Sequence, residues 1–214
     1  MGRMVSVAAV ALALLGGASS ASGARAAPSL ARVPSCRFPG ALGRQGAGPP
    51  RRAPRDARAR VFFLPTGRGR PDAIYGCADG VGRAVRLGTV ADFGARGGSG
   101  VGAIALAGTE VAVAVLTVHQ FADPVAVELY DLRTGRRRWR WSGASGSYDD
   151  VSALVLGPGG TAAWVGDQDG TASDGFGIFR ADRAGTVREL AFSDAQPTHL
   201  VVRDGHVTWS APAP

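Results

Sequence analysis

The sequence lacks lysine and asparagine altogether, and it contains only two cysteines and three histidines. The absence of asparagine excludes Asn-linked glycosylation, which needs an Asn acceptor. The histidines at positions 119, 199 and 206 do not stand at a zinc-ligand spacing, so no zinc site is expected. A Gly-x-Ser-x-Gly motif is also absent, since Gly97–Val101 fails at its last position. After the N-terminal region no window keeps an apolar period of about 3.6 residues, which argues against helices.

Long hydrophobic runs are missing as well. The longest, Val5–Leu15, is too short for a comfortable membrane span, because a spanning helix needs about 20 apolar residues. Arg3 precedes this run, and Ala24–Ala26 offers a small-x-small cleavage site after it. We therefore predict that residues 1–26 are a Sec-type signal peptide and that the mature protein is secreted. The alternative is that the segment stays uncleaved as a membrane anchor.

The net charge of +7 is unevenly distributed. Between Pro28 and Arg60 there are eight arginines and one acid, whereas Val61–Pro214 holds 14 arginines and 16 acids. The N-terminal segment is also rich in proline and poor in large apolar residues. We therefore predict a disordered basic arm over residues 27–60. Such an arm is able to contact an anionic surface, either cell-wall polymer or membrane lipid; the alternative is a solvated linker without a function of its own.

The two cysteines, Cys36 and Cys77, lie in the arm and in the first β segment. In an exported protein an even number of cysteines predicts a disulfide. This bridge would close a loop of about 40 residues and attach the arm to the folded part. A reactive or metal-binding pair of thiols is the alternative, although no Cys-x-x-Cys spacing supports it.

The residues that are abundant form a repeated hairpin. An apolar strand, a Gly-centred turn and a second apolar strand occur at Ile104–Val115, at Leu154–Val165 and at Leu200–Trp209. A spacing of about 45–50 residues between all-strand units is typical of propeller blades. We predict an all-β domain over 61–214, built as a propeller-like stack of about three four-stranded units, open or incomplete. The last hairpin (199–209) would pair with the first strands (61–87). A β-sandwich is the alternative fold.

One turn resembles a known repeat. Leu129–Trp139 follows the pattern Ala-x-Asp-x-x-Thr-Gly-x-x-x-Trp of the quinoprotein (PQQ-dependent alcohol dehydrogenase-like) propellers, with Leu129 in place of Ala. The motif residues are Asp131, Thr134, Gly135 and Trp139. The resemblance implies a propeller-like sheet stack but no cofactor, and many members of this family are non-enzymatic binding scaffolds. By strand alternation Trp139 and Trp141 share one face, while Arg138 and Arg140 point the other way.

A weaker pattern of three aspartates suggests a metal-binding loop. Asp167, Asp169 and Asp174 alternate beside turn glycines and offer oxygen ligands for calcium, although the pattern falls short of an EF-hand loop. An ordinary acidic hairpin loop is the alternative. The adjacent acids Asp149 and Asp150 also indicate a solvated loop rather than a general acid–base pair, because neighbours in a strand face opposite sides.

Together these patterns predict a secreted β-repeat binding or scaffolding module without catalytic activity, at the cell envelope. Its partner would be a protein or an envelope polymer, contacted through loops at 88–102, 142–150 and 166–176. Nucleic acid is not an expected partner, and an incomplete ring would allow an oligomer. The alternative is an enzyme, either a quinoprotein-like or a carbohydrate-acting propeller fragment.

Overall fold

The computed structural model describes residues 36, 55–56, 58–64, 66, 70–91, 98–118, 125–143, 150–168 and 175–210. The predicted signal peptide, most of the predicted arm and parts of the three predicted contact loops lie outside these residues. Within the described part no helix is long and apolar enough to cross a membrane.

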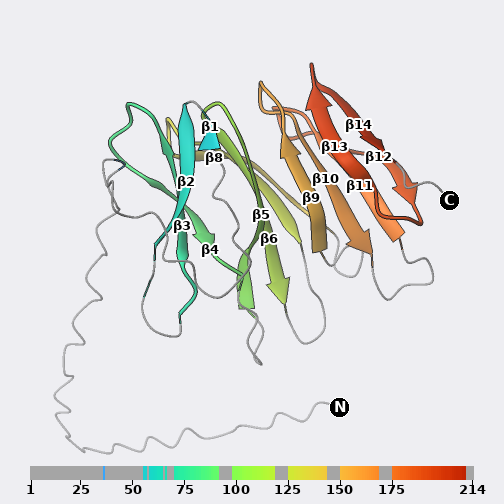
Figure 1. Cartoon of the computed structure of the whole chain (residues 1–214), viewed down its shortest axis with the longest axis horizontal. Coiled ribbons are helices and arrows are strands. Elements are labelled where there is room, and N and C mark those ends of the chain that lie inside the picture. The colour runs from blue at the N-terminus through green and yellow to red at the C-terminus, as the bar shows by residue number, and fades with distance from the viewer. Residues whose placement is uncertain are drawn as a thin grey trace, which may run out of the picture. The chain divides into compact units, whose positions relative to one another are not determined.

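The described residues form fourteen strands and no helix (Figure 1). Three antiparallel sheets have four strands each, and a fourth sheet has two. Sheet 1 comprises β1 (Arg55–Asp56), β2 (Ala59–Leu64), β3 (Ala73–Ala78) and β4 (Val85–Thr89). Sheet 2 comprises β5 (Gly98–Ala107), β6 (Glu110–Val118), β7 (Ala126–Asp131) and β8 (Arg136–Ser142). Sheet 3 comprises β9 (Asp150–Leu156), β10 (Ala162–Gln168), β11 (Gly175–Ala181) and β12 (Val187–Ser193). Sheet 4 comprises β13 (Thr198–Arg203) and β14 (His206–Ser210).

Each four-stranded sheet is a simple up-and-down arrangement in which every strand pairs with its neighbours in sequence. This confirms the predicted all-β class and the propeller-like stack of three four-stranded units. The hairpins expected from alternating apolar residues and Gly-centred turns are all present. In sheet 2, for example, Ile104 of β5 pairs with Val113 of β6. Val111 of β6 in turn pairs with Tyr130 of β7.

The last hairpin corrects one prediction. It does not pair with the first strands, since β13 and β14 pair only with each other among the described residues. Sheet 1 obtains its fourth strand from β1 instead, where Arg55 pairs with Arg60. Both β1 and the beginning of β2 fall within the segment predicted as a disordered arm. The strands therefore start before the predicted boundary at Val61, because short strands rich in arginine lack the apolar alternation that marks a strand in sequence.

Part of the contact loop predicted at 88–102 is strand instead. Strand β5 begins at Gly98, which pairs with Val118 of β6. Val101, in the same stretch, forms an isolated parallel bridge with Val90, just after β4. Glycine is unfavourable within strands, so the sequence favoured a loop there. Residues 98–101 form a strand because their backbone groups pair with β6, and the local preference of glycine does not predict that pairing.

Sheets 2 and 3 have register shifts at equivalent positions of the repeated hairpin. The pairing of β5 with β6 shifts register at Gly102, between Val101 and Ala103. In sheet 3 the pairing of β9 with β10 shifts where Val151 and Ala153 flank Ser152. Gly102 and Ser152 occupy the same place in the two hairpins aligned from sequence. A bulge at equivalent positions indicates that the two copies share their backbone course as well as their apolar pattern.

Three hydrophobic clusters join consecutive sheets. One packs sheet 1 against sheet 2 through residues such as Ile74, Val111 and Leu132. The second packs sheet 2 against sheet 3, with Trp139 and Trp164 among its members. The third packs sheet 3 against sheet 4. Burial of apolar surface between neighbouring sheets stabilises the stack and places the turns at their ends.

Candidate functional site

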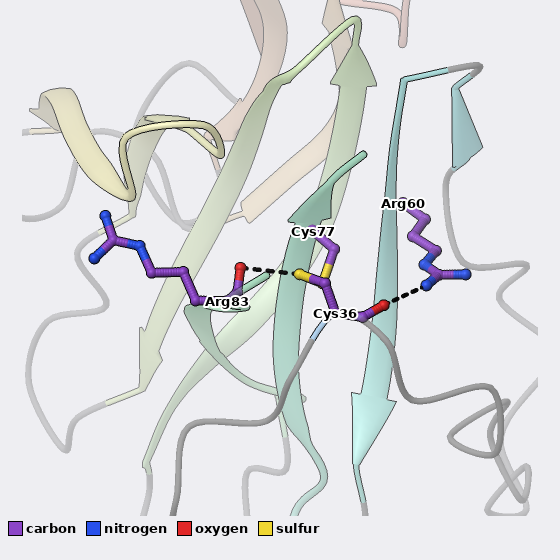
Figure 2. The surroundings of a disulfide bond; sticks show 4 residues. All are labelled: Cys36, Arg60, Cys77 and Arg83. Atoms are coloured by element: carbon purple, nitrogen blue, oxygen red, sulfur yellow. Dashed lines mark hydrogen bonds between the residues drawn. A yellow bond between two sulfur atoms is a disulfide. The ribbon is translucent and has the colours of Figure 1, made fainter. Parts of the chain in front are cut away.

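The disulfide predicted from the cysteine count is present. Cys36 is bonded to Cys77, with 5.7 Å between the two Cα atoms (Figure 2). Cys77 is buried on β3, and the backbone N–H of Cys36 donates to the carbonyl of Gly82 at 3.2 Å. A loop of 41 residues stabilises the fold by about 4 kcal/mol in the loop-entropy description. The bridge therefore fixes Cys36 beside the turn between β3 and β4.

Arg60 adds a second restraint to this region. Its guanidinium donates to the backbone carbonyl of Cys36 at 2.6 Å (Figure 2). The Sγ atom of Cys36 also lies 2.9 Å from the carbonyl oxygen of Arg83. This second approach is a contact rather than a hydrogen bond, because a sulfur in a disulfide carries no proton to donate.

The turn after β3 separates two hollows in the surface. The smaller, of about 150 Å³, is bounded by the disulfide, Arg60, Ala78 and residues 79–82. The larger, of about 300 Å³, is lined by Arg58, Asp79, Gly80, Val81, Thr109 and Arg133. We call the larger one the turn hollow. Its walls come from four separate turns, so no continuous stretch of sequence encodes it.

The lining of the turn hollow carries more positive than negative charge. Arg58 and Arg133 supply two guanidinium groups, and Asp79 supplies one carboxylate. Among the described residues no salt bridge joins either guanidinium to an acid. The Arg58 backbone is fixed from both sides, since its carbonyl accepts from Asp79 N–H at 2.8 Å and its N–H donates to Asp56 at 3.2 Å. An anionic group would find two donors of charge-assisted hydrogen bonds here.

Arg133 is positioned by the motif turn. The Oδ1 atom of Asp131 accepts from the backbone N–H of Arg133 at 2.9 Å and from that of Thr134 at 3.4 Å. Gly135 has a φ of +72°, the left-handed conformation that glycine adopts without strain. Burial opposes ionisation of Asp131, but these amide bonds and the charge of Arg138 outweigh it and lower the pKa of the carboxyl. The motif therefore builds a rigid turn at the edge of the hollow.

A contact between sheets holds the same turn from outside. The guanidinium of Arg83, which lies between β3 and β4, donates to the carbonyl of Thr134 at 2.6 Å. The last motif residue, Trp139, is buried in the cluster between sheets 2 and 3. A Cβ atom on Gly185, in the corresponding turn of sheet 3, would lie only 2.7 Å from the Cβ of Trp139. The motif tryptophan of sheet 2 therefore packs directly on the turn of sheet 3 that contains Gly185.

Sequence reasoning missed the corresponding aspartate in sheet 3. Asp182 accepts from the N–H groups of Ala184 and Thr186, each at 2.9 Å. These bonds, with that of Thr186 the most important, lower the pKa of the Asp182 carboxyl. Aligned on Gly185, Asp182 stands one residue later than Asp131 does relative to Gly135. A strict spacing hides this equivalence, whereas a search for any Asp shortly before a turn glycine would have found it.

The predicted direction of Arg138 on β8, the fourth strand of sheet 2, is wrong. The pairing of β7 with β8 shifts register between Leu129 and Tyr130, which leaves Arg138 without a direct partner. Arg138 therefore does not point the same way as Arg140. It lies near Glu110 at 3.1 Å and Asp131 at 3.1 Å, on the side of Trp139. Simple alternation fails because the bulge adds one residue to β8.

Two of the three remaining arginines of β8 pair with a buried acid. Arg137 and Arg140 approach Oε1 of Glu128 at 2.9 and 3.0 Å, and the Glu128 side chain is only 5 % exposed. The hydroxyl of Tyr130 donates to the same carboxylate. Burial, together with this negative neighbour, raises the pKa of Tyr130 to about 12. The arrangement therefore surrounds the buried carboxylate of Glu128 with two cations and a hydroxyl donor.

The predicted calcium ligands are only partly within the described residues. Asp167 lies on β10 and is partly buried, whereas Asp169 and Asp174 fall outside the described part. In the segments that the structure describes, no group of three or more His, Cys, Asp or Glu residues is placed to hold a metal. Asp149 also lies outside, while Asp150 accepts from the N–H of Val151 at 2.6 Å.

Comparison of the chain with family models, with curated proteins and with solved structures finds no match. The resemblance of Leu129–Trp139 to the quinoprotein repeat therefore remains a prediction from the motif alone.

Proposed function

We propose that this chain is a secreted β-repeat binding module without catalytic activity, and that it holds an anionic polymer of the cell envelope in the turn hollow. The observation that carries the proposal is the pair of arginines, Arg58 and Arg133, that line the hollow with no salt-bridge partner in the described segments. A guanidinium group suits carboxylate and phosphate, because its planar N–H groups donate two parallel hydrogen bonds to such anions.

The rigidity of the surrounding turns supports a binding role. The disulfide fixes the turn after β3, the Asp131 carboxylate fixes the backbone of Arg133, and Arg83 links the two turns through Thr134. A site that is ordered before the ligand arrives loses less conformational freedom on binding. The remaining ordering cost is that of two arginine side chains.

The charge of the hollow continues toward the predicted basic arm. Arg55, Arg58 and Arg60 are the last three arginines of that segment, and they stand on or beside β1 and β2. A polymer with repeated anionic groups is able to contact the hollow and the arm together. The second contact then forms at a high effective concentration, so the overall affinity exceeds that of either contact alone. Such binding weakens with added salt.

The experiment measures binding of the full mature chain to defined polymers by calorimetry. The probes are polygalacturonate, a polycarboxylate, and inorganic polyphosphate, with neutral dextran for comparison. We expect binding to both anionic polymers and none to dextran. The double variant Arg58→Gln, Arg133→Gln should weaken binding about tenfold, if each lost charge contact contributes about 0.7 kcal/mol.

A matched variant separates a specific site from net charge. Arg188→Gln with Arg203→Gln removes the same charge from the exposed surface of β12 and β13. We expect this pair to change the affinity about twofold or less, because neither residue lines the hollow. Equal weakening by both double variants would contradict the proposal. So would loss of binding in Arg51→Gln, Arg52→Gln alone, since the arm would then be the whole binding surface.

A further inference from the structure

Backbone hydrogen bonds join the turns that bound the turn hollow. Asp79 N–H donates to the carbonyl of Arg58 at 2.8 Å, which connects the turn between β3 and β4 with the one between β1 and β2. Leu132 N–H donates to the carbonyl of Thr109 at 2.9 Å, which connects the turn between β7 and β8 with the one between β5 and β6. The lining side chains therefore extend from a backbone that is ordered without a ligand.

Arg58 lies against the turn between β5 and β6. A Cβ atom on Gly108 would lie 3.2 Å from an Nη atom of Arg58, so the guanidinium rests on the backbone of this glycine. Gly108 has a φ of +61° at the first position of a two-residue turn, where glycine is preferred. Its N–H donates to Asp56 at 3.0 Å, and the same carboxylate accepts from the N–H of Arg58. These contacts hold the cation beside Thr109, the next lining residue.

Asp79 is not required by the turn on which it stands. Val81 N–H donates to the carbonyl of Ala78 at 3.2 Å, and Gly80 has a φ of +76° at the third position, as in a type II turn. Such a turn needs glycine at its third position but no acid at its second, where Asp79 stands. Among the described residues the Asp79 carboxylate forms neither a hydrogen bond nor an ion pair. Its charge therefore faces the hollow without a structural partner.

The polar side chains that line the hollow offer a mixed set of groups. None of them is paired within the described part of the chain; they are those of Arg58, Asp79, Thr109 and Arg133. Two guanidinium groups bind an acid, whereas a carboxylate accepts from O–H or N–H and repels an anion that has neither. The volume of about 300 Å³ lies at the lower end of the range of small-ligand pockets, so it suits one unit of a polymer.

We propose that the turn hollow takes a sugar acid, a unit of a polysaccharide that carries a carboxylate together with ring hydroxyls. Arg58 and Arg133 bind the carboxylate of the sugar, and the Asp79 carboxylate accepts from its hydroxyls beside Thr109. This inference rests on the proposed function and names the class of polymer. A polymer of phosphate alone gives Asp79 no hydrogen-bond donor and meets it as a like charge. Asp79 is therefore a specificity-determining residue.

The experiment measures binding of polygalacturonate and of inorganic polyphosphate to the full mature chain by calorimetry, at one low salt concentration. Asp79→Ala should weaken polygalacturonate binding about fivefold, because a hydrogen bond to a charged acceptor contributes more than an exposed like-charge pair costs. The same variant should strengthen polyphosphate binding about threefold, because only the repulsion is lost. Opposite signs identify a specific role, since a loosened turn would weaken binding of both polymers.

Two matched variants sharpen the result. Asp79→Asn keeps an acceptor oxygen without the charge, so polygalacturonate affinity should stay within about twofold while polyphosphate affinity still rises. Glu189→Ala removes an acid from the exposed surface of β12, outside the hollow. It should raise the affinity for both polymers about twofold or less, in the same direction.

The outcomes separate this inference from the proposed function. If Asp79→Ala changes the affinity for both polymers in the same direction, or if the wild type binds polyphosphate alone, the hollow does not select a sugar acid. The proposed function would still stand in that case, provided that Arg58→Gln with Arg133→Gln weakens the binding that remains. If this double variant changes neither affinity, or if the wild type binds neither polymer, the proposed function fails and the inference fails with it.

Discussion

Sheets 2 and 3 are two copies of one unit, and they differ most in their fourth strands. Both have four antiparallel strands, a bulge at the same place in the first strand, and an Asp-supported turn before the fourth strand. Strand β8 is rich in arginine, and its side chains pair with Glu110, Glu128 and Asp131. Strand β12 forms no salt bridge among the described residues and exposes Leu190 and Phe192.

The comparison separates what the repeat conserves from what it varies. The second and third strands of sheets 2 and 3 are largely buried on both faces, so their residues are constrained by packing against two neighbouring sheets. The fourth strand lies at a sheet edge and contacts fewer residues, so its side chains are free to differ. In sheet 2 this freedom places an ion network beside the motif turn. The unit is therefore a constant scaffold with a variable outer strand.

The largest expected effect comes from the interface that both sheets share. Trp164 of sheet 3 is fully buried, and its ring lies 5.1 Å from that of Trp141 and 5.5 Å from that of Phe179. Trp164→Ala should lower the free energy of unfolding by about 3–5 kcal/mol, because it opens a large cavity. Denaturant unfolding measures the loss.

Trp164→Phe is the matched variant for this interface. It keeps an aromatic ring, and the indole N–H that it removes has no hydrogen-bond partner in the described residues. We therefore expect it to cost clearly less than the alanine change. Losses of equal size would mean that the contacts of the ring do not hold the two sheets together.

A smaller effect should distinguish the fourth strands. Removing both cationic partners of Glu128, with Arg137→Gln and Arg140→Gln, leaves a buried carboxylate without a cation. We expect a loss of about 2–3 kcal/mol, below that of a fully buried pair because both arginines are half exposed. In sheet 3, Arg188→Gln should change stability by about 0.5 kcal/mol or less.

The origin of that loss has its own test. Adding Glu128→Gln to the double arginine variant removes the unpaired charge and should restore part of the stability. If the triple variant is less stable than the double one, the arginines act through packing of their side chains and the ion network is not what distinguishes sheet 2.

The smallest effect concerns the two Asp-supported turns. Asp131→Ala should cost about 1 kcal/mol, because the N–H groups of Arg133 and Thr134 lose their acceptor. Since the pKa of Asp131 in the folded state is below its ordinary value of 3.8, its contribution is present above that pH. The contribution disappears as the pH falls through the lower, folded-state pKa.

Denaturant unfolding between neutral pH and pH 3 measures this dependence. Asp131→Ala should lose less stability on acidification than the wild type does. Asp182→Ala should show the same direction with a smaller change, since no arginine adds to the backbone hydrogen bonds that lower the pKa of Asp182. An unchanged acid dependence in Asp131→Ala would show that its carboxylate does not stabilise the turn.

The hairpins were predictable because their signals are local. Alternating apolar residues and a turn glycine lie within about ten residues of one another, and pairing follows from them directly. The disulfide was predictable from the number of cysteines. Strand β1 and the start of β5 were not, because arginine-rich and glycine-rich strands owe their pairing to a neighbour rather than to their own propensity.

The candidate site was the least predictable part. Arg58, Asp79 and Arg133 come from three turns that only the packing of sheet 1 against sheet 2 brings together. The bulge at Arg138 reversed the expected direction of one arginine, and alternation gives no warning of such an extra residue. The motif located the wall at Arg133 and gave no indication of the other three.

The pairing of each strand with its sequence neighbours has a mechanical consequence. Tension between the chain ends would unzip hairpins one after another, because no strand is trapped between distant segments. Residues between Cys36 and Cys77 would stay looped behind their covalent bond, which withholds about 14 nm of extended chain. The oxidised protein should therefore stretch less far under load than the reduced one, by the length of that single loop.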